Sequence, residues 1–156
     1  MLASSYESAD APSGYQAVAN LIARYAELVD DGDFAGLGVL LADATFIGSG
    51  APVHGREAIE KMFRDTLIVY SDGTPRTHHM TSNLAIEVDE RAGTAVSRSY
   101  VTVLQALPDL PLQAIAGGRY RDRFERRDGR WCFLERRVRI HLVGDVSSHL
   151  RQAAAL

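Results

Sequence analysis

Apolar side chains recur at helical spacing in the first part of the chain. Residues 15–31 carry one apolar stripe, made of Val18, Leu21, Ile22, Tyr25, Leu28 and Val29. Such a stripe predicts a helix with one buried face. Gly32 can adopt a left-handed conformation after this helix, and Asp33 can cap a second helix over residues 34–42.

A third helix is predicted over residues 55–70, after a short strand over residues 44–50. The inner side of this helix is predicted to consist of Ile59, Met62, Phe63 and Leu67. Both segments lie before the turn-forming stretch SDGTP, and beyond that stretch the pattern changes.

Apolar and polar residues alternate with a period of two in the second half of the chain, which predicts β-strands. The strands are expected over residues 76–89, 94–107, 113–127 and 131–142. Their turns are DERAG, PDLP and RDG, and the last is a short hairpin signal. Successive strands with short connections form an antiparallel sheet, so the three helices and this sheet predict the α+β class.

One folded domain over residues 15–142 is expected, with a lead-in over 1–14 and a tail over 143–156. The tail is interpreted as a frayed helix or an oligomer arm. The length of 156 residues suits one hydrophobic core. The start of the chain lacks a secretory pattern, no apolar run is long enough for a bilayer, and Cys132 has no partner for an internal disulfide. A cytoplasmic protein with no membrane contact is therefore expected.

The net charge of −3 argues against nucleic acid as a partner. Arginines crowd residues 119–139, but Asp122, Glu125, Asp128 and Glu135 are interleaved with them. This composition favours a solvated surface of mixed charge.

Arg136 breaks the apolar pattern of the last predicted strand. It falls in a row with Cys132, Leu134, Val138, Ile140 and Leu142. A buried guanidinium needs a carboxylate or an anionic ligand beside it, because burying it unpaired is costly. Both a ligand-binding role and a structural ion pair remain open.

Two further positions are candidates for chemistry. Asp30 ends the first predicted helix, where the helix dipole disfavours an anion. In the stretch RTHHMTSNL, strict alternation places His78 and not His79 on the face of the apolar residues that follow. A bulge in the strand would reverse this assignment.

Three stretches resemble the SnoaL-like branch of the nuclear-transport-factor-2-like superfamily, which includes scytalone dehydratase and hexachlorocyclohexane dehydrochlorinase. They are ARYAELVDDGDFAGLGVLLADATF, HHMTSNL and GGRYRDRFERRDGRWCFLERRV, within residues 15–142. The resemblance implies a curved antiparallel sheet packed against three N-terminal helices, forming a cone with an internal pocket (a cystatin-like α+β barrel). It also implies a catalytic Asp30–His79 pair, with Arg136 as a third site residue five positions after Trp131.

The resemblance further implies a cofactor-independent lyase of the dehydratase type, or an isomerase. Asp30 would orient His79, which would remove a proton from a small hydrophobic substrate, for instance a cyclic or polyketide-like one. The alternative is a binding protein of the same fold without turnover. No cofactor and no metal are required. The expected pocket walls are Ile22, Tyr25, Phe46, Met62, Phe63, Tyr100 and Tyr120.

A homo-oligomer is also expected, with a trimer favoured over a dimer. Trp131 and Phe133 are predicted to lie on the outward face of the sheet, where they would form an exposed apolar patch. Relatives with the same acid–histidine pair are trimeric.

Overall fold

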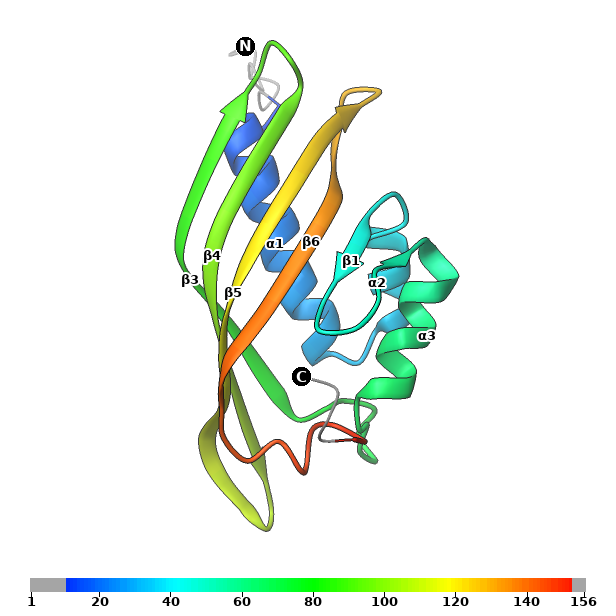
Figure 1. The fold of residues 1–156 in the computed structure, drawn as a ribbon, viewed down its shortest axis with the longest axis vertical. Helices are drawn as coiled ribbons and strands as arrows, with labels where there is room; N and C mark the ends of the chain where they lie inside the picture. The colour runs from blue at the N-terminus through cyan, green and yellow to red at the C-terminus, as the bar shows by residue number, and fades with distance from the viewer. Residues whose placement is uncertain (1–10, 153–156) are drawn as a thin grey trace, which may run out of the picture.

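The computed structural model describes residues 11–152, and Figure 1 shows their arrangement. The helices are α1 (Gly14–Asp30), α2 (Phe34–Leu40) and α3 (Arg56–Thr66). The strands are β1 (Thr45–Ile47), β2 (Val53–His54), β3 (Thr77–Asp89), β4 (Thr94–Leu107), β5 (Leu110–Arg127) and β6 (Arg130–Val143). The four long strands fall where the alternating pattern predicted them.

The six strands form one open, mixed sheet in the order β2-β1-β6-β5-β4-β3. The long strands pair antiparallel as neighbours along the chain, as predicted. β1 adds a parallel pair with β6, in which Phe46 lies opposite Arg136. The sheet is therefore mixed rather than purely antiparallel. β1 precedes the four long strands in the chain and pairs with the last of them, β6.

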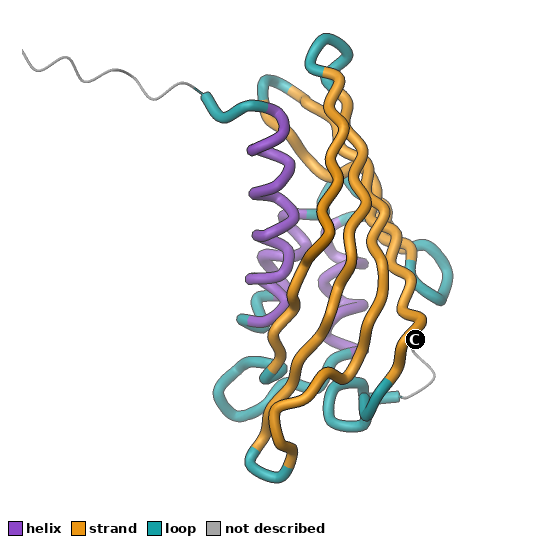
Figure 2. Tube along the Cα trace, turned by 90° about the vertical axis from the view of Figure 1, so that its left-hand side faces the viewer, coloured by secondary structure: helices purple, strands orange, loops and turns teal. Residues whose placement is uncertain are grey.

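All three helices lie on one side of the curved sheet, and Figure 2 shows that its other side is bare. α1 runs along the inner face and packs mainly against β3. Val18, Ile22 and Leu28 of its apolar stripe are almost fully buried. The α+β class with helices against one face of a sheet is confirmed. None of the helices in residues 11–152 is long and apolar enough to cross a bilayer.

Local sequence signals account for the helix ends. The Ser13 side chain caps α1, and Asp33 Oδ1 accepts a hydrogen bond of 2.8 Å from Gly36 N at the start of α2, as predicted. α3 ends at Thr66 rather than at residue 70. Leu67 is already extended and forms a bridge with Leu150, so contact with the tail replaces the last predicted turn.

Two of the register shifts in the long strands change which predicted residues face inward. In β3 the register shifts between Ser82 and Ala85, where Asn83 has a φ of 51°. In β6 the register skips Leu134, so Phe133 faces inward and is only 1% exposed. The expected outward patch of Trp131 and Phe133 is therefore wrong: Phe133 packs against Phe124, and Trp131 lies under the guanidinium of Arg126.

The described part of the tail, up to residue 152, is neither a helix nor an extended arm. It folds back onto the end of α3, where Arg151 N donates to Thr66 O at 2.9 Å. Gln105 of β4 donates to Ser148 O at 3.0 Å. Val146, His149 and Leu150 become buried as a result. The remaining tail residues and residues 1–10 lie outside the described part.

Candidate active site

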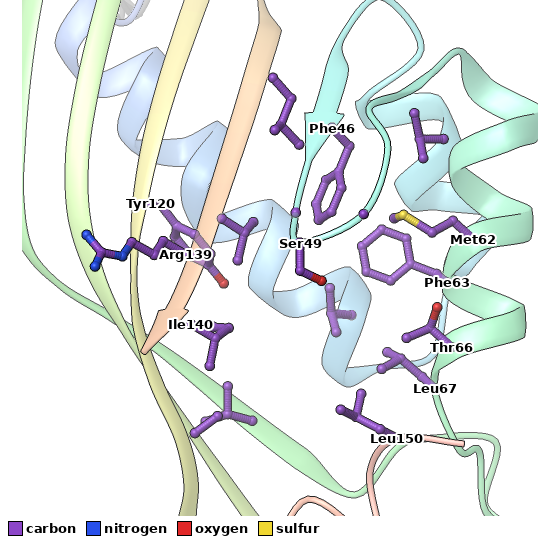
Figure 3. A pocket seen from close by; sticks show the side chains of 18 of the residues that line it. Phe46, Ser49, Met62, Phe63, Thr66, Leu67, Tyr120, Arg139, Ile140 and Leu150 are labelled. Atoms are coloured by element: carbon purple, nitrogen blue, oxygen red, sulfur yellow. The ribbon is translucent and has the colours of Figure 1, made fainter. Parts of the chain in front are cut away.

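A cavity of about 850 Å³ lies between the inner face of the sheet, the helices and the tail. Figure 3 shows Phe46 and Ser49 of the β1 region facing Met62 and Phe63 of α3 across it. Val103, Tyr120, Val138 and Ile140 supply the wall from the sheet, and Val146, His149 and Leu150 supply it from the tail. Most of this surface is apolar, so its polar groups stand out as candidates for chemistry.

Asp30 is held at the end of α1 by three donors from β3. The Thr77 hydroxyl donates to Oδ1 at 2.8 Å, and the His79 backbone N–H donates to Oδ2 at 2.8 Å. β3 is an edge strand, which leaves this N–H free for a side chain. The three donors compensate for the unfavourable position of an anion at a helix C-terminus.

The third donor is the His79 ring, whose Nδ1 lies 2.6 Å from Asp30 Oδ1. The expected contact between these two residues is therefore present. Burial would raise the pKa of Asp30, but hydrogen bonds from His79 and Thr77 outweigh it and hold that pKa below its usual value. An anionic Asp30 fixes the tautomer of His79, with the proton on Nδ1 and Nε2 left as an acceptor.

His79 and not His78 faces the cavity. The His79 side chain is 10% exposed and lines the cavity, while His78 is exposed on the other face. The bulge at Asn83 explains the reversal, because it places Thr77 and His79 on the inner face together with Leu84 and Ile86 beyond it. Alternation alone pointed to the wrong histidine for this reason.

His149 is a cavity residue that the sequence pattern missed. Its ring centre lies 6.3 Å from that of His79, and its Nδ1 is buried without a hydrogen bond in the described chain. Burial, with a smaller contribution from His79, lowers the pKa of His149 to about 4. The ring is therefore neutral at physiological pH. No periodic signal marks this residue, because the tail has no regular secondary structure.

Arg136 pairs with Asp122 inside the core. Its Nε and Nη2 each lie 2.9 Å from a different carboxylate oxygen of Asp122, and both side chains have no exposed surface. The Ser97 hydroxyl also donates to Asp122, at 3.3 Å. This is the two-pronged geometry in which arginine binds a carboxylate most strongly.

Two tyrosine rings enclose the Arg136 guanidinium. Its carbon lies 4.0 Å from the centre of the Tyr25 ring and 3.9 Å from that of Tyr120. Burial would lower the pKa of Arg136, but Asp122 outweighs it and raises that pKa above its usual value. Burial also raises the pKa of Tyr25 to about 12, so this phenol stays protonated. Arg136 does not line the cavity. The geometry agrees with the structural ion pair and not with a ligand-binding role.

Comparison with known proteins identifies the architecture. Residues 13–137 match the SnoaL-like domain. The chain belongs to the SnoaL-like family. No curated protein matches the sequence.

Solved structures share the fold of this SnoaL-like chain. Rv3472, a protein of unknown function from Mycobacterium tuberculosis, is 28% identical with a TM-score of 0.68, over 85% of this chain and 80% of that one. An NTF2-like protein with a cystatin-like fold from Novosphingobium aromaticivorans is 23% identical with a TM-score of 0.65, over 90% and 85%. A protein from the same organism, provisionally assigned as a scytalone dehydratase, is 22% identical with a TM-score of 0.65, over 84% and 86%.

Five of the seven predicted pocket walls of the SnoaL-like chain line its cavity. They are Tyr25, Phe46, Met62, Phe63 and Tyr120. Ile22 is 2% exposed in the core and does not reach the cavity. Tyr100 is on the opposite face of the sheet, 43% exposed, because Ser99 and Val101 take the inward positions of β4.

The described residues contain no group of three or more histidine, cysteine, aspartate or glutamate side chains that could hold a metal ion. The cavity lining holds two imidazoles, that of His79, which is paired with Asp30, and that of His149. Its other polar residues are Tyr25, Ser49, Thr66, Tyr120, Arg137 and Arg139. Such a set can accept a proton at His79 and donate a hydrogen bond from His149.

Proposed function

We propose that the chain is a cofactor-independent lyase of the dehydratase type, or an isomerase, acting on a small hydrophobic molecule. The observation that carries the proposal is the contact between Asp30 and His79, because His79 lines an apolar cavity. Membership of the SnoaL-like family supports an enzyme-like or ligand-binding role in general. The cavity volume suits a cyclic or polyketide-like molecule.

In this proposal His79 is the general base. Asp30 holds the proton on Nδ1, so Nε2 accepts a proton from a carbon of the substrate. In a dehydration the electron pair of that C–H bond forms the new double bond and the C–O bond breaks. The leaving oxygen takes up the proton from His79 and departs as water. In an isomerisation the proton returns to another carbon. A positioned base of this kind contributes about 10²–10⁴-fold to the rate.

We propose that His149, rather than Arg136, stabilises negative charge that develops on a substrate oxygen. A neutral imidazole donates a hydrogen bond without the cost of burying a cation. The low pKa of His149 keeps it in this form. The apolar walls exclude water and strengthen the interaction.

A carbon-acid probe tests the proposal without knowledge of the natural substrate. We would follow the ring opening of nitrobenzisoxazole, in which a base removes the ring C–H proton, a nitrile forms, the N–O bond breaks and a coloured phenolate is released. We expect the parent protein to accelerate this reaction. His79→Gln should lose about 10²-fold or more of that acceleration.

His78→Gln is the matched control, because it removes the neighbouring histidine, which lies outside the cavity. Its rate should equal that of the parent. Equal rates for His79→Gln and the parent would overturn the proposed base. If the probe binds, as followed by NMR, but reacts no faster than in buffer, the alternative of a binding protein without turnover is favoured.

We also retain a homo-oligomer as a proposal, with a trimer favoured and a dimer second. Its support is now the exposed side chains of Leu112, Leu142 and Val143 at one end of the β5–β6 ladder. Such side chains are commonly covered in an assembly. A monomer mass by light scattering at micromolar concentration would contradict it.

A further inference from the structure

The bare face of the sheet carries a cluster of exposed arginines. It consists of Arg98 in β4, Arg119, Arg121 and Arg123 in β5, and Arg137 and Arg139 in β6. Figure 3 shows the guanidinium of Arg139 pointing away from the cavity, toward this face. We call these six residues the arginine face.

Strand alternation separates the arginines from the acids between them. Asp122 points inward to Arg136, and Glu125 pairs with Arg127 near the end of the hairpin. The mixed-charge surface expected from composition is therefore present only in part on this face. Glu87 and Glu135 are the acids that pair with it, through Arg98 at 3.8 Å and Arg137 at 3.2 Å. Six arginines against two glutamates leave four unbalanced positive charges.

The register brings like charges directly opposite one another. Arg121 lies between Arg98 and Arg137, and Arg119 lies opposite Arg139. Like charges at opposite positions destabilise a sheet. Among the described residues, Arg121, Arg123 and Arg139 have no ion pair or hydrogen bond from their side chains that would compensate. The arrangement lowers the stability of the isolated chain, which points to a use outside it.

We propose that the arginine face docks an acidic α-helix of a partner protein. Alternate residues of a strand are about 6.6 Å apart, so Arg119, Arg121 and Arg123 span about 13 Å. Carboxylates four residues apart on a helix are about 6 Å apart and span about 12 Å over three positions. A row of glutamates or aspartates on one helix face therefore matches the row along β5, with Arg137 and Arg139 beside it.

Two other occupants fit the face less well. Single-stranded nucleic acid lacks a stacking partner on this face, because the Tyr100 ring is already covered by Arg119 at 4.8 Å and offers no free surface to a base. A second copy docked face to face would oppose one excess of positive charge with another.

The test uses a fluorescein-labelled helical peptide with glutamates four residues apart, followed by fluorescence anisotropy at low ionic strength. The face variant combines Arg119→Gln, Arg121→Gln and Arg123→Gln, the row along β5, none of which lines the cavity or belongs to an ion pair among the described residues. The matched control combines Arg91→Gln, Arg130→Gln and Arg151→Gln, three exposed arginines elsewhere. We expect the peptide affinity to fall about tenfold in the face variant and to stay unchanged in the control.

The proposal is overturned if the parent does not bind the peptide, or if both variants lose affinity equally. Tighter binding of a labelled oligothymidylate through the same arginines would overturn it in favour of nucleic acid. A parent oligomer that the face variant dissociates, seen by light scattering, would overturn it in favour of a second copy. Turnover of nitrobenzisoxazole should be the same in all three proteins, so this test is independent of the proposed function.

Discussion

Two aspartates lie on the inner side of the same sheet, and they differ in their partners and in their exposure. Asp30 meets a histidine at the cavity wall, where its side chain is 18% exposed and that of His79 is 10% exposed. Asp122 meets an arginine in the core, and neither side chain has any exposed surface. A histidine can gain and lose a proton near neutral pH, and an arginine cannot. Access and a titratable partner, rather than burial alone, distinguish a site for chemistry from a structural ion pair.

The largest effect should come from breaking the core pair. Arg136→Met leaves the Asp122 carboxylate buried without its strongest partner, which costs about 3–5 kcal/mol of unfolding free energy. Urea denaturation measures the loss. Arg137→Met is the matched control, because it removes an exposed arginine from the next position, and its unfolding free energy should change by about 0.5 kcal/mol or less. An Arg136→Met protein as stable as the parent would mean that the pair has no structural role.

The stability of the cavity end of the molecule should depend on pH through His149. The pKa of His149 is lowered from 6.5 to about 4, so between these values the unfolded chain binds a proton that the folded chain does not. The unfolding free energy should therefore fall by about 3 kcal/mol as the pH drops from 6.5 to 4.

The control for this pH effect is His149→Gln, which keeps a neutral polar side chain and removes the titration. Its stability should vary less with pH over the same window. Below pH 3.8 the depressed pKa of Asp30 adds a second loss, because its anionic form is stabilised only in the folded chain. An identical pH profile for parent and His149→Gln would contradict the assignment.

Breaking the Asp30–His79 pair should reduce stability less than breaking the core pair, but it should reduce turnover strongly. Asp30→Asn keeps the shape of the side chain but loses the charge that fixes the His79 tautomer. We expect turnover of nitrobenzisoxazole to fall about 10²-fold, while the unfolding free energy falls by about 1–2 kcal/mol. Asp31→Asn, at the exposed neighbouring position, should leave both unchanged. Turnover that survives in Asp30→Asn would show that the acid has no part in the chemistry.

The sequence predicted the elements of the fold well because long periodic segments carry a strong signal. Bulges interrupt the strand alternation near the Asp30–His79 pair and near the Asp122–Arg136 pair. Counting from the tight turn at Asp128 and Gly129, where φ is 50° and 77°, would place Asp122 opposite Glu135. The skipped residue Leu134 shifts the register by one, so that Asp122 lies opposite Arg136. Periodicity cannot locate such a residue, because a bulge depends on packing between strands.

Resemblance to a family succeeded where periodicity failed, but only for part of the site. It identified His79 through the motif around Asn83, which itself forms the bulge. It also carried over Arg136 as a site residue, although in this chain the arginine lies in the core. His149 was beyond both methods, because a tail without regular structure reaches the cavity only through contacts with α3 and β4.

The smallest net effect should come from replacing the whole core pair. Asp122→Leu combined with Arg136→Met removes both buried charges, so neither is left unpaired. The faces of Tyr25 and Tyr120 lose their cation, and the Ser97 hydroxyl loses its acceptor. These two losses offset part of the stability gained by removing the buried charges. We expect the double variant to lie within about 1–2 kcal/mol of the parent in urea denaturation, well above Arg136→Met alone. Turnover of nitrobenzisoxazole should stay within a few-fold of the parent, since Asp30 and His79 keep their contact. A double variant as unstable as the single one would show that the tyrosines, rather than Asp122, are the partners that hold Arg136 in the core.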